Sequence, residues 1–122
     1  MINFDIRIDK NYNKNDFYDL LVEALIMKND NQKAIIELCE ALLLLETKEE
    51  AYNFLKDLCT PQEMKVLAER WKVCKLLEKG DLSYRDISFI TGASLTTIGR
   101  VARFLRNEPY HGYLAILNKM KK

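Results

Sequence analysis

Apolar residues recur three and four positions apart along most of this sequence, the spacing that places them on one face of a helix. A first amphipathic helix is predicted over residues 16–28, with Asn15 as its cap, and the polar Asn-Asp-Asn sequence at 29–31 should end it. A second helix is predicted over residues 32–46, where apolar side chains fall almost all round the helix. A short chain has little else to cover such a helix, so we expect it to be buried against a second subunit.

Capping signals set the limits of the helices that follow. Threonine followed three residues later by glutamate occurs at 47–50 and at 60–63, and this is the pattern of a capping box, in which each residue's side chain accepts a hydrogen bond from the other's amide. Pro61 favours the first position of a helix, and Gly80 favours a helix end. The helices predicted beyond residue 46 span residues 48–58, 61–79, 84–90, 95–106 and 113–120.

Residues 83–106 have the pattern of a helix-turn-helix. Ser83 caps the first helix, Gly92 allows the left-handed backbone of a tight bend, and Ser94 caps the second helix. The two helices can pack only if their inward positions are apolar. The residues expected at this contact are Ile87, Ile90 and Ala93 before the second helix, and Ile98, Val101 and Leu105 within it.

The second helix of this pair carries the side chains needed to read DNA. Small, polar and apolar groups that fit base edges come first, and arginines that bind phosphates or guanine edges follow. The candidate DNA-binding residues here are Ser94, Leu95, Thr96, Thr97, Gly99, Arg100 and Arg103. Arg106 continues the run, and a solvated charged surface is the alternative interpretation of Arg103 and Arg106.

The charge distribution agrees with nucleic-acid binding by the second half of the chain. The net charge is only +1, but residues 1–60 hold seven Lys and Arg against twelve Asp and Glu, whereas residues 61–122 hold twelve against six. A local basic surface attracts the phosphate backbone whatever the total charge is.

Other functional classes lack their characteristic residues. The longest apolar run falls far short of the roughly 20 residues of a membrane span, and no leader pattern follows Met1. The three cysteines include no Cys-x-x-Cys pair, which favours reduced thiols and a cytoplasmic location. With one histidine, His111, and no catalytic triad or phosphate-binding loop, we expect neither a metal site nor an enzyme.

A specific resemblance covers residues 58–107, "LCTPQEMKVLAERWKVCKLLEKGDLSYRDISFITGASLTTIGRVARFLRN". This segment resembles the Trp repressor superfamily, and most closely its YerC/YecD-like branch. The resemblance implies an all-α fold of six to seven helices and an interlocked homodimer. The two reading heads of such a dimer enter successive major grooves, about 34 Å apart, of a near-palindromic double-stranded operator. The implied organisation is an arm at 1–14, dimer-forming helices at 15–58, a repressor-like core at 59–107 and a C-terminal helix at 108–122.

The resemblance also assigns roles to single residues. Arg85 matches a position that contacts DNA from the first helix of the pair, and Leu95, Thr96 and Gly99 match positions close to the bases. Thr97 matches a residue shared by the DNA face and the effector site. The residues that match the surroundings of the corepressor tryptophan are Thr60, Arg70, Thr97 and Arg100, with the two arginines enclosing the indole ring.

Two departures from that pattern argue against tryptophan as a cofactor. Val101 stands where the repressor has glycine, and Phe104 stands where it has serine, so both add bulk where the indole would lie. Phe104 could fill the slot itself and hold the reading helix in place. For Thr60 and Arg70 we prefer a structural role to a place in an effector site. Thr60 is expected to cap a helix, and Arg70 is expected to pair with an acid such as Glu69 or Glu63.

We interpret the sequence as a dimeric, sequence-specific DNA-binding transcriptional regulator, most simply a repressor that occludes a promoter. Two alternatives stay open at this point. One is a repressor of the same fold that is gated by an amino acid, and the other is a helix-turn-helix that docks a protein partner.

Overall fold

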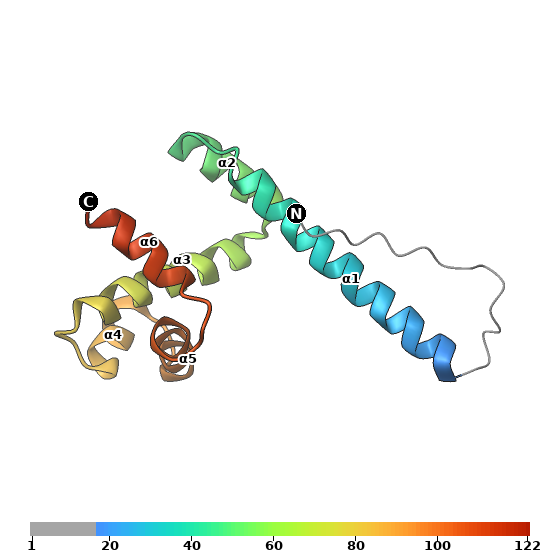
Figure 1. The fold of residues 1–122 in the computed structure, drawn as a ribbon. Coiled ribbons are helices and arrows are strands. Elements are labelled where there is room, and N and C mark those ends of the chain that lie inside the picture. The colour runs from blue at the N-terminus through green and yellow to red at the C-terminus, as the bar shows by residue number, and fades with distance from the viewer. Residues whose placement is uncertain (1–16) are drawn as a thin grey trace. The chain divides into compact units, whose positions relative to one another are not determined.

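The computed structural model describes residues 17–122, which form six helices and no β-strand (Figure 1). The helices are α1 (Phe17–Leu42), α2 (Lys48–Leu58), α3 (Pro61–Lys79), α4 (Tyr84–Thr91), α5 (Leu95–Arg106) and α6 (Gly112–Met120). The all-α class predicted from the sequence is confirmed. The chain divides into two compact units, of which the first ends at Tyr52 and the second spans Asn53–Lys122. The arm predicted at residues 1–14 lies outside the described residues.

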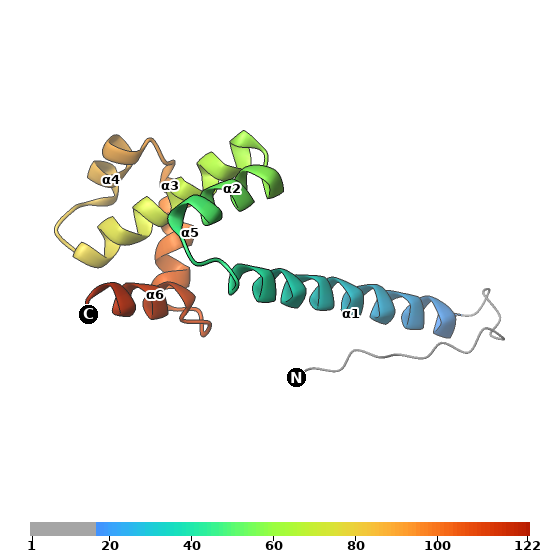
Figure 2. The ribbon, with the colours of Figure 1, turned by 90° about the horizontal axis from the view of Figure 1, so that it is seen from above.

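The helix α1 runs without interruption through residues 29–31, so the break predicted there is wrong (Figures 1 and 2). Asn and Asp each disfavour a helix by less than about 0.7 kcal/mol relative to alanine, and neither glycine nor proline is present to interrupt the hydrogen-bond ladder. The residues predicted as two helices therefore form one.

The predicted second helix also ends earlier than expected, at Leu42 instead of residue 46. The amide of Glu46 donates to Glu50 Oε2 at 3.0 Å, and the amide of Glu50 donates to Thr47 Oγ1 at 3.0 Å. The capping of α2 thus begins at Glu46, one residue before the predicted box, and leaves only a short turn after α1. Leu43 and Leu44 in this turn are 86% and 77% exposed.

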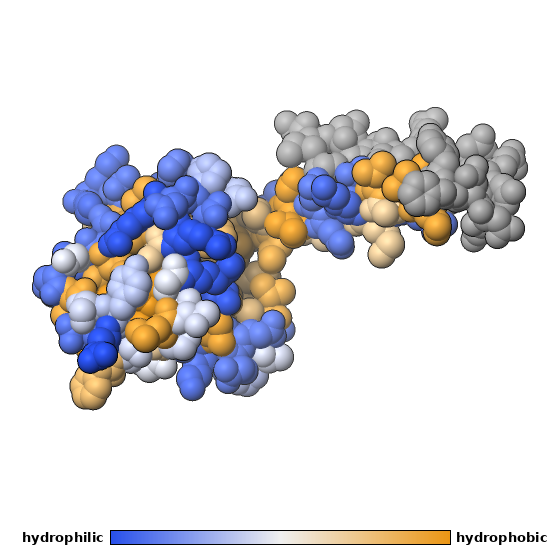
Figure 3. All heavy atoms as spheres, turned by 90° about the horizontal axis from the view of Figure 1, so that it is seen from below, coloured by the Kyte–Doolittle hydropathy of each residue, from blue (hydrophilic) through white to orange (hydrophobic). Residues whose placement is uncertain are grey.

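Apolar side chains are exposed along α1 and the turn after it, and Figure 3 shows them in orange among polar neighbours. The exposed apolar residues of this segment are Leu20, Leu21, Leu25, Met27, Ile35, Leu42, Leu43 and Leu44. Burial of apolar surface is worth roughly 25 cal/mol per Å², so covering this face would be favourable. Burial against a second subunit remains a prediction. None of the helices in residues 17–122 is long and apolar enough to cross a membrane.

The predicted caps of the second unit are confirmed. The Thr60 side chain accepts from the Glu63 amide at 3.1 Å, and Glu63 Oε1 accepts from the Thr60 amide at 3.0 Å. This capping box also lowers the pKa of Glu63 below its usual value, because the ionised carboxylate accepts that amide hydrogen bond. At the other end of α3, Gly80 has the left-handed φ of 83° that ends the helix.

The core of the second unit lies where α3, α4 and α5 pack against one another, with α6 packed on α5. Its buried residues are Val73, Cys74, Leu77, Ile87, Ala93, Ile98, Val101, Ala102, Leu105 and Leu117. Trp71 and Tyr113 pack at its edge with their ring centroids 6.4 Å apart. Five of the six residues predicted at the helix-turn-helix contact belong to this core.

Ile90 is the exception, because its side chain is 47% exposed. It follows Ile87 by three residues, or about 300° of helix rotation, and so lies about 60° to the side of the buried face. Three other apolar side chains at helical spacing are also exposed: Leu67 in α3 and Ile116 and Met120 in α6. These helices have narrower buried faces than their apolar residues indicate.

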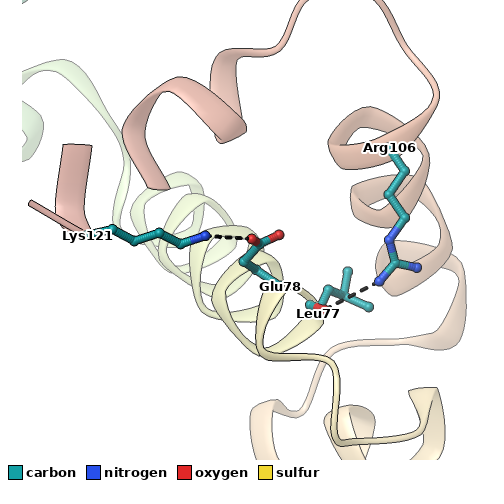
Figure 4. A network of polar contacts seen from close by, with 4 residues as sticks. All are labelled: Leu77, Glu78, Arg106 and Lys121. Atoms are coloured by element: carbon teal, nitrogen blue, oxygen red, sulfur yellow. Dashed lines mark hydrogen bonds and ion pairs between the residues drawn. The ribbon is translucent and has the colours of Figure 1, made fainter. Parts of the chain in front are cut away.

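Two polar contacts join the ends of these helices (Figure 4). Arg106 Nη2 donates to the carbonyl oxygen of Leu77 at 3.3 Å, and Lys121 Nζ pairs with Glu78 Oε1 at 3.1 Å. The Leu77 carbonyl is one of the last four of α3 and has no helical donor of its own. Arg106 therefore caps α3 from the end of α5, which is a structural role.

Replacing Arg106 by alanine should lower the free energy of unfolding by about 1 kcal/mol, because the Leu77 carbonyl loses its donor. Urea unfolding followed by the fluorescence of Trp71, the single tryptophan, measures this change. Lys75→Ala is the control, since Lys75 is an exposed lysine on α3 and its loss should change stability by less than about 0.5 kcal/mol. Equal midpoints for the two variants would contradict the capping role.

Candidate nucleic-acid interface

The turn between α4 and α5 is fixed by its backbone and by two hydroxyl groups. Gly92 has the left-handed φ of 78° that the sequence predicts. Thr91 Oγ1 donates to the Ile87 carbonyl at 2.7 Å and accepts from the Ala93 amide at 3.1 Å. Ser88 Oγ donates to the Ala93 carbonyl at 2.7 Å. Sequence reasoning did not single out Ser88 and Thr91, although hydroxyl residues beside a turn glycine are a usable signal.

The helix α5 has two distinct faces. Its buried face is formed by Ile98, Val101, Ala102 and Leu105. Its outer face carries Leu95, which is 60% exposed, together with Thr96, Gly99, Arg100 and Arg103. Five of the predicted DNA-binding residues therefore share one outward surface, called here the reading face.

Ser94 and Thr97 differ from the rest of the predicted set because their hydroxyls bond to each other. Ser94 Oγ accepts from the Thr97 amide at 3.1 Å and donates to Thr97 Oγ1 at 3.1 Å. Ser94 is thus the N-cap of α5, as predicted, and both hydroxyls already have partners within the turn. Direct contact of these two residues with DNA remains a prediction.

Gly99 is unusual within the reading face because it lies in a helix interior. Glycine at such a position disfavours the helix by about 1 kcal/mol relative to alanine. A Cβ atom at Gly99 would meet no other group within 4 Å. The fold itself gives no reason for glycine here.

Arg85 lies on the outer surface of α4, exposed as a DNA-contacting residue must be. It lines a hollow together with Leu82, Asp86, Phe89 and Ile90. Phe89 is 92% exposed, which is unusual for so large an apolar group. Phe89 is not among the residues predicted for the site, although its place on the polar side of α4 is a usable signal.

Arg100 and Arg103 both lie over the ring of Phe104. Their guanidinium carbons are 4.6 Å and 5.0 Å from the ring centroid, within the range of a cation–π interaction. Tyr110 stacks on Phe104 with the centroids 6.2 Å apart, and Arg103 Nε also pairs with Glu108 Oε1 at 3.3 Å. Phe104 therefore orders the two arginines of the reading face.

A cavity of about 250 Å³ lies beside this cluster. It is lined by Arg70, Arg100, Val101, Phe104, Tyr110, Gly112 and Tyr113. Arg70 and Arg100, two of the four predicted effector-site residues, are thus brought together. Thr60 and Thr97 are not among the residues that line the cavity. Typical small-molecule sites measure about 300–1,000 Å³, so only a small group would fit.

Arg70 has a different environment from the one predicted. Its Nε is buried and has no hydrogen-bond partner among the described residues. The expected pairing with Glu63 or Glu69 is absent there, and the Glu63 carboxylate instead accepts from the Thr60 amide. A buried donor without a partner costs about 1–3 kcal/mol, so Arg70 carries an unmet hydrogen-bonding capacity beside the cavity.

Cys74 is a free cysteine that is buried in the core of the second unit. Burial, with a smaller contribution from Glu78, raises the pKa of the Cys74 thiol to about 11, so it is protonated and unreactive at neutral pH. In the part of the chain that the structure describes, no three His, Cys, Asp or Glu side chains come together to hold a metal ion.

Comparisons with known proteins agree with this geometry. Residues 33–121 match the family model described as Trp repressor protein. The uncharacterized protein YerC of Bacillus subtilis (strain 168) is 39% identical over 90 residues, which are 74% of this chain and 85% of YerC. A crystal structure of a Staphylococcus aureus protein, provisionally assigned as a Trp repressor, has a TM-score of 0.68 at 40% identity and covers 73% of this chain and 87% of its own. A TrpR-like protein of Eubacterium eligens ATCC 27750 has a TM-score of 0.68 at 37% identity, with coverage of 73% and 90%.

Proposed function

This chain belongs to the Trp repressor protein family, and on that premise we propose that it is a sequence-specific DNA-binding regulator that acts as a homodimer. The observation that carries the proposal is the reading face of α5, held outward by the left-handed turn at Gly92. The name of the family model and of the Staphylococcus aureus neighbour supports a repressor, which occludes a promoter when bound.

The role proposed for each residue follows from the chemistry of its side chain. Arg100 and Arg103, ordered on the Phe104 ring, would bind phosphates or guanine edges. Leu95 and Thr96, at the start of α5, would meet base edges, and Arg85 would contact DNA from α4. The exposed apolar face of α1 supports the homodimer. Two reading heads about 34 Å apart would then require a near-palindromic operator.

Selection of bound fragments from random double-stranded DNA tests this function. A conserved half-site that recurs as an inverted repeat about one helical turn apart is the expected result. If no sequence is enriched and no salt-sensitive binding is seen, the proposal fails.

The salt dependence of binding should identify the phosphate contacts. Replacing Arg103 by alanine should reduce the slope of log K against log salt by about 1, because one fewer counterion is released. A fluorescence anisotropy titration of the selected duplex at several salt concentrations measures the slope. Lys119→Ala, which removes a lysine from α6, should leave it unchanged. Equal slopes for wild type and Arg103→Ala would remove Arg103 from the interface.

We propose that the protein binds DNA without tryptophan, because Phe104 supplies an aromatic ring that already orders Arg100 and Arg103. A second candidate function, a repressor gated by a different small molecule, is favoured by Arg70 and Arg100, which both line the cavity. An acceptor such as a carboxylate would pair with their guanidinium groups. Thermal shift against a panel of amino acids distinguishes the two candidates, since only the gated repressor should be stabilised.

A further inference from the structure

Of the four glycines in this unit, Gly80 and Gly92 have a conformational reason that Gly99 and Gly112, the first residue of α6, lack. Gly80 and Gly92 have φ values of +83° and +78°, where a side chain would be strained. Gly99 lies within the regular helix α5, where any residue except proline is sterically acceptable and glycine is among the least favourable.

Packing gives no reason for glycine either. A Cβ atom built on Gly99 would find no heavy atom of another group within 4 Å, so a side chain would enter open space. The missing side chain therefore leaves the backbone of α5 partly exposed between its neighbours, and this gap is called here the notch. The reason for the notch must be sought outside this unit.

The residues around the notch indicate what would enter it. Leu95 precedes Gly99 by one helical turn and Arg103 follows by one turn, so an apolar group and a cation stand at its two ends. Thr96 adds a hydroxyl beside Leu95. Apolar contact, a hydroxyl and a guanidinium are together the groups that recognise base edges in the major groove.

We propose that Gly99 is a specificity-determining residue, at which the edge of a base pair enters the notch and contacts the backbone of α5. This inference rests on the proposed function, because it requires that the reading face bind duplex DNA. Because Gly99 has no side chain, α5 can lie deeper in the major groove of DNA than a helix with a side chain at this position. A side chain at this position would separate the flanking groups from the bases.

The test measures the affinity of Gly99→Ala and Gly99→Leu for two duplexes of equal length. One duplex is the operator selected by the wild-type protein, and the other has the same base composition in scrambled order. Specific affinity should fall at least about tenfold for alanine and further for leucine, because bulk in the notch lifts α5 from the bases. Affinity for the scrambled duplex should stay within about twofold, because phosphate contacts dominate it.

Thermal unfolding of the same variants separates this effect from damage to the fold. The Tm of Gly99→Ala should rise by a few degrees, since alanine favours the helix. The control is Ala115→Gly, an opposite change at an exposed position of α6, which should lower the Tm and leave both affinities unchanged. Sedimentation should give the same oligomeric state for all variants.

Each other outcome overturns the proposal. Unchanged specific affinity would show that nothing enters the notch, and equal losses on both duplexes would show a contact with the DNA backbone instead of a base. A change in oligomeric state would assign the notch to a second copy of the chain. If the wild-type protein itself selects no operator, the proposed function fails. This result is distinguishable from a failure of the Gly99 proposal, because it is obtained with the wild-type protein alone.

Discussion

Replacing Ile98 by alanine should lower the free energy of unfolding by about 2–4 kcal/mol. Ile98 is fully buried (0% exposed) on the inner face of α5 and belongs to the core formed by α3, α4 and α5. Truncation there removes transfer energy and leaves a cavity. Whole domains are stable by only about 5–15 kcal/mol, so the loss is a large fraction of the total. Urea unfolding followed by Trp71 fluorescence measures it.

Leu95→Ala provides the matched control on the same helix. Leu95 is 60% exposed on the reading face, so its truncation should change stability by less than about 0.5 kcal/mol. The same variant should weaken binding to a selected operator by about tenfold, because losing the recognition of one base pair typically costs about 1–3 kcal/mol. Equal destabilisation by the two variants would show that the two faces of α5 are assigned wrongly.

The double variant Val101→Gly, Phe104→Ser should gain the ability to bind L-tryptophan that we expect the wild-type protein to lack. The change removes both groups that add bulk beside Arg100 and retains Arg70 and Arg100, the two arginines that line the cavity. Binding at one hundred times the Kd would stabilise the variant by about 2.7 kcal/mol. Thermal shift in increasing tryptophan concentrations measures this gain.

The same variant should be less stable than wild type before ligand is added. Val101 is 1% exposed, so its loss should cost about 2–4 kcal/mol, and the new glycine adds about 1 kcal/mol of helix cost. Adding Arg70→Ala to the double variant should abolish the tryptophan effect. If the folded double variant does not bind tryptophan, the bulk of Val101 and Phe104 is not what excludes it.

The parts of the fold that sequence patterns predicted well are those decided within a few residues. Thr60 with Glu63, Gly80, Gly92 and Ser94 set helix ends through hydrogen bonds or backbone angles that their own neighbours satisfy. The break at residues 29–31 failed because propensity there is only mildly unfavourable, and a continuous hydrogen-bond ladder outweighs it. Local chemistry predicts where a helix can end, but it does not force a helix to end.

In the candidate site, some features could be predicted from the sequence and others could not. The turn and the reading face follow from periodicity, since residues three and four apart share a face. The surroundings of Arg70 do not follow from periodicity, because they depend on how α3 and α5 pack together. They also depend on the Glu63 carboxylate, which accepts a hydrogen bond from the Thr60 amide. The exposure of Phe89 likewise depends on which face of α4 the core covers. Contacts between helices decide these features, so they cannot be predicted from the spacing of residues along one helix.

The hydroxyl bonds of Ser88, Thr91 and Ser94 have a consequence for the order of folding. Each of them joins residues no more than five positions apart. Contacts this local close with little loss of chain entropy and form rapidly, whereas the association of two subunits depends on their concentration. The turn should thus take shape early in each nascent chain, and in the proposed homodimer the bends of both heads would be set before the subunits associate.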